Sequence, residues 1–208
     1  MNLTAEQQAA IAAKVNSMTL PKGMGDEHSA CSIAAINLAL SGRLTDKIPD
    51  CMSEAVGKWV IRVQDAMPDE MRNSKTWKGL LPLAAGTGRE HERERLAIIM
   101  DWLWVVVLPY VQPIADAGGY GKEWRDMYQT RTREAARAAA WAAAWAAGAA
   151  EAAAWEADWA AEEAEAAEAA WAAAGAAWWA AEASGDPGKA WEHFDPCGLL
   201  AKLVEVGK

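Results

Sequence analysis

The stretch from residue 134 to residue 183 constrains the fold most, because 31 of its 50 positions are alanine and none is proline. Alanine has the highest helix propensity of the common residues, so this stretch is expected to be helical in almost any surroundings. One uninterrupted helix of this length would extend about 75 Å. The alternative is two or three shorter antiparallel helices, with bends at Gly148 and Gly175, since glycine weakens a helix relative to alanine.

The remainder of the chain also has the spacing of helices. We expect helices over residues 4–18, 29–40, 50–67, 74–81 and 199–206, a further helix from about Arg89 through the apolar stretch that follows, and helix from Lys122 onward. Thr4 with Gln7, and Thr87 with Glu90, have the spacing of capping boxes. No stretch alternates apolar and polar residues with β-branched enrichment. The sequence therefore predicts an all-α fold.

Charge divides the chain into parts. Residues 1–133 carry 16 acids and 16 bases, whereas residues 134–183 carry nine acids and one base, Arg137. We expect a helical body over 1–133, an acidic alanine- and tryptophan-rich segment over 134–183, and a loop with a C-terminal helix over 184–208 that closes on the body. Nucleic-acid binding is not expected, because neutralising phosphates needs clustered Lys and Arg.

Four tryptophans punctuate the alanine-rich segment as two pairs spaced four residues apart. Trp141, Trp145, Trp155 and Trp159 fall within about 80° of arc on an ideal helix. We interpret this stripe as a coiled-coil-like interface, in which the indoles interlock against the chain's own body or against a second copy. If the stripe packs against a second copy, the chain is expected to form a homo-oligomer. The alternative is that some of these indoles form a binding surface for a partner or a flat ligand.

A loop before the expected helix at Arg89 is the candidate site for a small anionic ligand. Gly86, Thr87 and Gly88 would present backbone N–H groups at a helix N-terminus, with Arg89 and Arg93 close by. The spacing of a P-loop is missing, and no strand precedes the loop. Helix capping alone would also explain Thr87.

Other polar clusters favour structural roles. Asp26, Glu27, His28 and Cys31 lie together, but adjacent carboxylates splay apart and do not converge on a metal. Asp101 lies in an apolar stretch, where a buried carboxylate needs a partner such as a core arginine or serves as a functional acid. No metal, cofactor or catalytic residue is expected.

Cysteine content and hydropathy indicate a cytoplasmic protein. The chain has an odd number of cysteines, Cys31, Cys51 and Cys197, and no two of them form a CxxC pair. This favours reduced thiols. The N-terminus lacks the pattern of a signal peptide. The longest apolar stretch, Leu96–Val111, contains Asp101 and is short for a membrane span, so a buried core helix is expected.

Four stretches outside the alanine-rich segment together carry a resemblance to known proteins: Ser32–Leu38, Leu44–Ser74, Leu80–Trp104 and Phe194–Val206. They resemble an uncharacterised group of bacterial and bacteriophage proteins, in which an alanine-rich, aromatic-punctuated segment lies between a helical body and a short C-terminal helix. The group has no known activity, so no site residue is transferred. The resemblance implies an accessory protein of bacterial or phage origin.

These observations favour a non-enzymatic binding protein. In a phage setting it would be a counter-defence protein that binds a host protein or sequesters a small signalling nucleotide. One alternative is a structural self-assembly module made by the alanine- and tryptophan-rich helices. The other is an enzyme that works from the Asp26–Cys31 and Arg89–Asp101 regions.

Overall fold

The computed structural model describes residues 3–144, 148–163 and 165–208. These residues are helical with no strand, and their β structure is limited to two isolated bridges, Thr19 with Ser29 and Gly25 with Ala30. The all-α prediction is therefore confirmed. The chain forms two compact units, one of residues 1–95 with 196–208 and the other of residues 96–195. The division falls inside a helix at Arg95 and Leu96, and not at residues 133 and 134 as expected.

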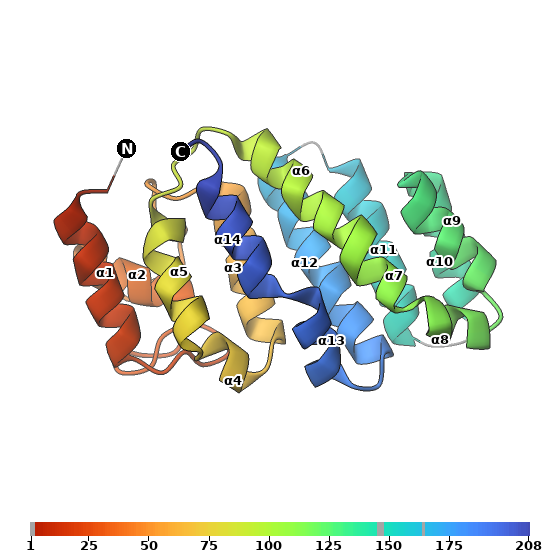
Figure 1. The fold of residues 1–208 in the computed structure, drawn as a ribbon, viewed down its shortest axis with the longest axis horizontal. Helices are drawn as coiled ribbons and strands as arrows, with labels where there is room; N and C mark the ends of the chain where they lie inside the picture. The colour runs from red at the N-terminus through yellow and green to blue at the C-terminus, as the bar shows by residue number, and fades with distance from the viewer. Residues whose placement is uncertain (1–2, 145–147, 164) are drawn as a thin grey trace. The chain divides into compact units, whose positions relative to one another are not determined.

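The first unit is built from helices at both ends of the chain. They are α1 (Ala5–Ser17), α2 (Ser32–Ser41), α3 (Glu54–Ala66), α4 (Asp69–Arg72), α5 (Lys75–Ala85), the start of α6 (Glu92–Trp102) and α14 (Pro196–Glu205). Figure 1 shows α14 beside α3 and α5, and α1 packs on α2 and α5. In the core the rings of Trp59 and Trp77 lie 6.2 Å apart, and the Trp77 indole donates to the Ser32 hydroxyl over 3.1 Å.

Two helix ends in this unit are formed by residues next to them in the sequence, as predicted. Thr4 and Gln7 form the predicted capping box at the start of α1. Gly42 ends α2 in the left-handed region at φ 69°, a conformation that glycine adopts without steric cost. The expected start at Arg89 is wrong, since α6 begins at Glu92.

The second unit contains the rest of α6 and the helices up to Asp195. They are the π-helix η1 (Leu103–Val107), α7 (Leu108–Tyr110), α8 (Gln112–Ala117), α9 (Gly121–Thr130), α10 (Arg133–Ala143), α11 (Gly148–Glu162), α12 (Ala166–Ala183) and α13 (Pro187–Phe194). The described residues of the alanine-rich segment thus form three helices, α10, α11 and α12, and a single long helix is excluded. Gly148 begins α11 as the expected break, but Gly175 is buried within an unbroken α12.

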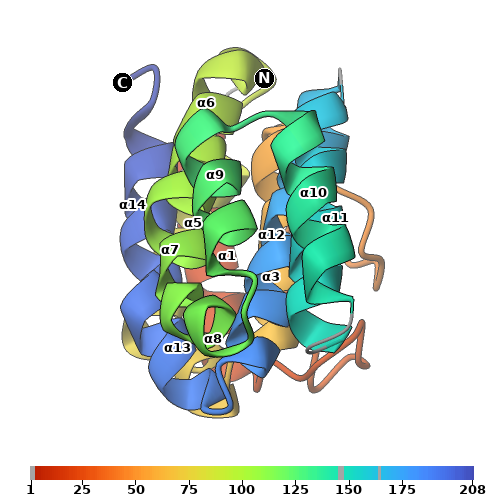
Figure 2. The same ribbon diagram turned by 90° about the vertical axis from the view of Figure 1, so that its right-hand side faces the viewer.

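Alanine fills the seams between these three helices. The buried residues of α10 are Ala136, Ala139, Ala140 and Ala143, and α11 buries alanines at 150, 153, 154 and 157 with the same spacing. α10 packs on α11, α11 packs on α12, and Figure 2 shows α10 and α11 side by side. α12 is buried around most of its circumference and also packs on η1, α7 and α13. Methyl side chains allow helices to approach closely.

Bulky residues fill a separate part of the second unit, around α13 and the helices it contacts. The Trp102 indole donates to the backbone carbonyl of Phe194 over 2.6 Å, and the two rings meet edge to face. The Trp124 indole donates to the carbonyl of Leu108 over 2.8 Å. Within the described residues, no helix combines the length and the hydropathy needed to cross a membrane.

Candidate functional site

The tryptophans of this chain divide sharply between the interior and the surface. All six that lie outside the alanine-rich segment are buried: Trp59, Trp77, Trp102, Trp104, Trp124 and Trp191. The six described ones within the segment are not: Trp141 and Trp159 are 67% and 63% exposed, and Trp155, Trp171, Trp178 and Trp179 are half-buried. Large apolar side chains therefore gather on the outside of the alanine-packed helices.

Ion pairs set the register between α10 and α11. Asp158, only 6% exposed, accepts from Arg133 Nε over 3.2 Å and from Arg137 Nε over 3.1 Å. Arg133 also pairs with Glu162. As the residue number rises along α10, the residue number of the partner on α11 falls, so the two helices run antiparallel. The two cations of α10 are thereby neutralised by acids of α11.

One turn further along, the same two helices bring their indoles together. Trp141 and Trp155 meet edge to face with ring centroids 5.8 Å apart, and the Trp155 indole donates to Glu151 over 3.4 Å. Trp159 follows one turn after Trp155. We call the side chains of Trp141, Trp155 and Trp159 the tryptophan face.

The tryptophan face is not a seam against the chain's own body. Trp141 and Trp159 are largely exposed, so that part of the interface prediction is wrong. The physical reason is that an indole inserted between α10, α11 and α12 would force apart helices that alanine holds close together. An interface with a second copy stays a prediction, and Trp145 lies outside the described residues.

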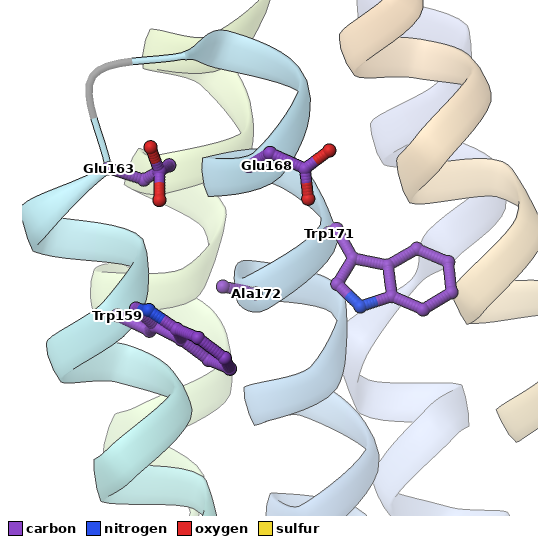
Figure 3. A pocket seen from close by; sticks show the side chains of 5 residues that line it. All are labelled: Trp159, Glu163, Glu168, Trp171 and Ala172. Atoms are coloured by element: carbon purple, nitrogen blue, oxygen red, sulfur yellow. The ribbon is translucent and has the colours of Figure 1, made fainter.

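A cleft opens next to the tryptophan face, between α11 and α12. It has a volume of about 150 Å³ and is lined by Trp159, Glu163, Glu168, Trp171 and Ala172. Figure 3 shows the two indoles on either side of Ala172, with both carboxylates at one end. No cation partner of Glu163 is found among the described residues. The cleft combines aromatic walls with negative charge, which suits a cationic group.

Charge distinguishes the two units strongly. Residues 96–195 carry sixteen acids and six bases, a net charge of −10, whereas the other unit carries thirteen acids and fourteen bases, a net charge of +1. The tryptophan face and the cleft thus belong to the unit that holds essentially all of the excess negative charge.

The loop expected to bind an anion has its polar groups occupied by the protein. The Thr87 hydroxyl accepts from the Ser53 N–H over 2.9 Å and donates to the Ala84 carbonyl, so it does not cap α6. Arg89 pairs with Glu54 over 2.7 Å and lies 3.9 Å from Asp50. Gly88 is buried and Arg93 is exposed. Gly86 and Thr87 line one hollow, but Gly88, Arg89 and Arg93 are not part of its lining.

Arg95, a buried arginine two residues after Arg93, organises this loop. Arg95, 1% exposed, donates to the carbonyls of Thr87, Gly88, Glu90, Leu203 and Val206. A guanidinium has five N–H donors, and all five are used here. Arg95 lines a hollow of about 340 Å³ together with Gly86 and Thr87, but it has no N–H left for a ligand. The anion site stays a prediction with little support from this geometry.

The remaining polar candidates have structural partners. The Asp26 carboxylate accepts from the N–H groups of His28 and Ser29, and these bonds lower its pKa. The Cys31 thiol caps α2, and burial raises its pKa. Asp101 is 65% exposed and pairs with Arg131 over 3.2 Å, so the expectation of a buried carboxylate is wrong although its arginine partner exists. No metal-binding group of His, Cys, Asp and Glu is found in the described residues.

A signal for the tryptophan face was present in the sequence. Glu151, Trp155, Trp159 and Glu163 follow one another at intervals of four residues. Neighbours at this interval lie on the same side of a helix, so the indoles share their side with acids. Acids normally face solvent, which places these tryptophans outside.

Comparison of the chain with known protein families, with curated proteins and with solved structures gives no match. The resemblance to bacterial and phage proteins therefore stays an expectation, and the functional argument depends on the geometry and charge described above.

Proposed function

We propose that the chain is an interaction protein that binds a positively charged protein partner through the tryptophan face. One observation carries the proposal: Trp141 and Trp159 are largely exposed and none of the six described tryptophans of the alanine-rich helices is fully buried, although the same residue type is buried everywhere else in the described chain. Exposed apolar patches mark interaction sites. Tryptophan is also among the residues that contribute most to binding at protein interfaces.

Charge selects the kind of partner. The unit that carries the tryptophan face has a net charge of −10, so it attracts a basic surface and repels a second copy of itself. In the bacterial or phage setting implied by the resemblance, the partner is a basic host protein and the role is counter-defence. Sequestration of a signalling nucleotide has less support, because the donors of Arg95 are used within the protein.

Calorimetry with a short arginine- and lysine-rich peptide tests the proposal. We expect the peptide to bind the full chain, with affinity that falls as salt screens the charges. Changing Trp141 and Trp159 together to Ala should weaken binding by about tenfold or more. Both side chains are largely exposed, so the fold should survive. Val105→Ala is the matched control, because Val105 is 52% exposed in the same unit and lies outside the tryptophan face.

Two results would contradict the proposal. The first is equal affinity of the peptide for the wild type and the double variant. The second is a wild-type dimer, measured by sedimentation, that the double variant dissociates while neither binds the peptide. That second result would favour the self-assembly module, in which a second copy covers the tryptophan face.

A further inference from the structure

The cleft between α11 and α12 offers two kinds of contact to one small group. The indoles of Trp159 and Trp171 lie on either side of the Ala172 methyl, and the carboxylates of Glu163 and Glu168 lie at one end (Figure 3). A flat apolar surface is thus adjacent to hydrogen-bond acceptors that carry charge. The cleft has a volume of about 150 Å³.

Glu163 differs from the other acids at the end of α11. Asp158 and Glu162 are paired with the arginines of α10, whereas Glu163 has no cation partner among the described residues and is half-buried. A partly desolvated carboxylate gains from a cation that also donates hydrogen bonds. Glu163 is therefore a carboxylate of the cleft that is available to a cation from outside the chain.

We infer that this cleft receives the guanidinium group of an arginine side chain of the partner. A guanidinium is planar, so its face stacks on the Trp159 indole while its N–H groups donate to Glu163. A lysine ammonium is compact and strongly hydrated and offers no flat face. A quaternary ammonium has no N–H to donate to the carboxylates. The inference rests on the proposed function, since it names the side chain by which the basic partner is recognised.

Three versions of one peptide, with arginine, lysine or citrulline at the same positions, separate these chemistries. Citrulline keeps the shape of arginine and removes its charge. Thirteen tryptophans make fluorescence ambiguous, so fluorotryptophan NMR of the full chain is the readout, with the Trp159 signal assigned as the one missing from Trp159→Phe. We expect the arginine peptide to shift the Trp159 signal and to bind about tenfold more tightly than the lysine peptide. The citrulline peptide should leave the signal in place.

Substitutions locate the contact. Glu163→Gln should weaken binding of the arginine peptide by about tenfold. It should also remove most of the difference in affinity between the arginine and lysine peptides. Glu182→Gln makes the same change of charge at an exposed position of α12 outside the cleft, and we expect it to stay within about twofold of wild type. Trp159→Phe keeps an aromatic surface and should bind better than Trp159→Leu.

Each remaining outcome has a distinct meaning. Equal binding of arginine and lysine peptides overturns the guanidinium assignment. Binding that survives Glu163→Gln and Trp159→Leu but is lost with Trp141→Ala overturns the cleft and leaves the proposed function intact. Failure of the wild type to bind either cationic peptide rejects the proposed function itself, and the cleft with it.

Discussion

Arg95 provides the sharpest test of how the first unit is held together. Its guanidinium is 1% exposed and joins two segments far apart in sequence, the loop at Thr87–Glu90 and the end of α14. The bond to Thr87 is 2.7 Å long and that to Val206 is 3.1 Å, whereas the contact with Gly88 at 3.4 Å is weak. We predict that Arg95→Met destabilises this unit strongly.

The magnitude follows from what the substitution leaves behind. A hydrogen bond to a charged group contributes about 1.5–3 kcal/mol, but bonds made by one guanidinium are not additive. Methionine also removes the cost of burying a cation, which offsets part of the loss. Each buried carbonyl that loses its donor costs about 1–3 kcal/mol, and with the offset just given we expect the free energy of unfolding to fall by about 3–5 kcal/mol in total. With a urea slope of about 2 kcal/mol/M, the unfolding midpoint of this unit moves down by about 2 M.

Urea unfolding followed by circular dichroism measures the midpoint, and hydrogen exchange of the α14 amides shows whether the loss lies in the first unit. Arg93→Met is the control, since Arg93 is exposed and its change removes the same charge. A fall of less than about 1 kcal/mol for Arg95→Met, or one no larger than in the control, would refute this reasoning.

Three further predictions concern local chemistry. Asp158→Asn should lower the unfolding free energy of the second unit by about 1–3 kcal/mol in urea titration, because the buried carboxylate accepts from two arginines of α10. The Cys31 thiol should react with a disulfide reagent more slowly than the half-buried Cys197, since Cys31 is buried and burial raises its pKa. NMR titration should place the pKa of Asp26 below the usual aspartate value, because two N–H groups bond to its charged form. Asp26 therefore stabilises the fold above its unfolded pKa, and this contribution is lost as pH falls through the folded value.

Helix ends that depend on neighbours in sequence were predictable, and those that depend on distant groups were not. The capping box at Thr4 and the glycine at the end of α2 satisfy backbone groups within one turn. Thr87 and Glu90 have the same spacing as Thr4 and Gln7, yet Thr87 bonds to Ser53. Ser53 caps α3 locally by accepting from the Val56 N–H, but the N–H groups of Glu54 and Ala55 donate to the distant carboxylate of Glu92. Local spacing contains no information about such partners.

The candidate site shows the same limit in another form. The sequence predicts helices and a clustered tryptophan stripe, and it favours a seam at this stripe because large apolar residues usually form the core. In a helix made mostly of alanine, acids without a cation partner mark the solvent side, whereas Asp158 is buried because it is paired with Arg133 and Arg137. On α11 the acids Glu151 and Glu163 lie on the same side as Trp155 and Trp159, and this side faces out. The positions of Glu151 and Glu163 therefore indicate the exposed side of α11 better than the positions of its large apolar residues.

The packing of the alanine-rich helices and the exposure of their tryptophans follow from one another. A seam of methyl groups buries little apolar area per residue, so α10, α11 and α12 depend on close approach and on the Asp158 ion pairs for stability. An indole cannot enter such a seam without separating the helices, and at the surface it contributes little to folding. The free energy gained by burying the indole can then stabilise a complex with a partner that covers it. If the proposed function holds, exposed indoles on an alanine-packed scaffold thus leave folding and binding to different residues, and the indoles can change without loss of the fold.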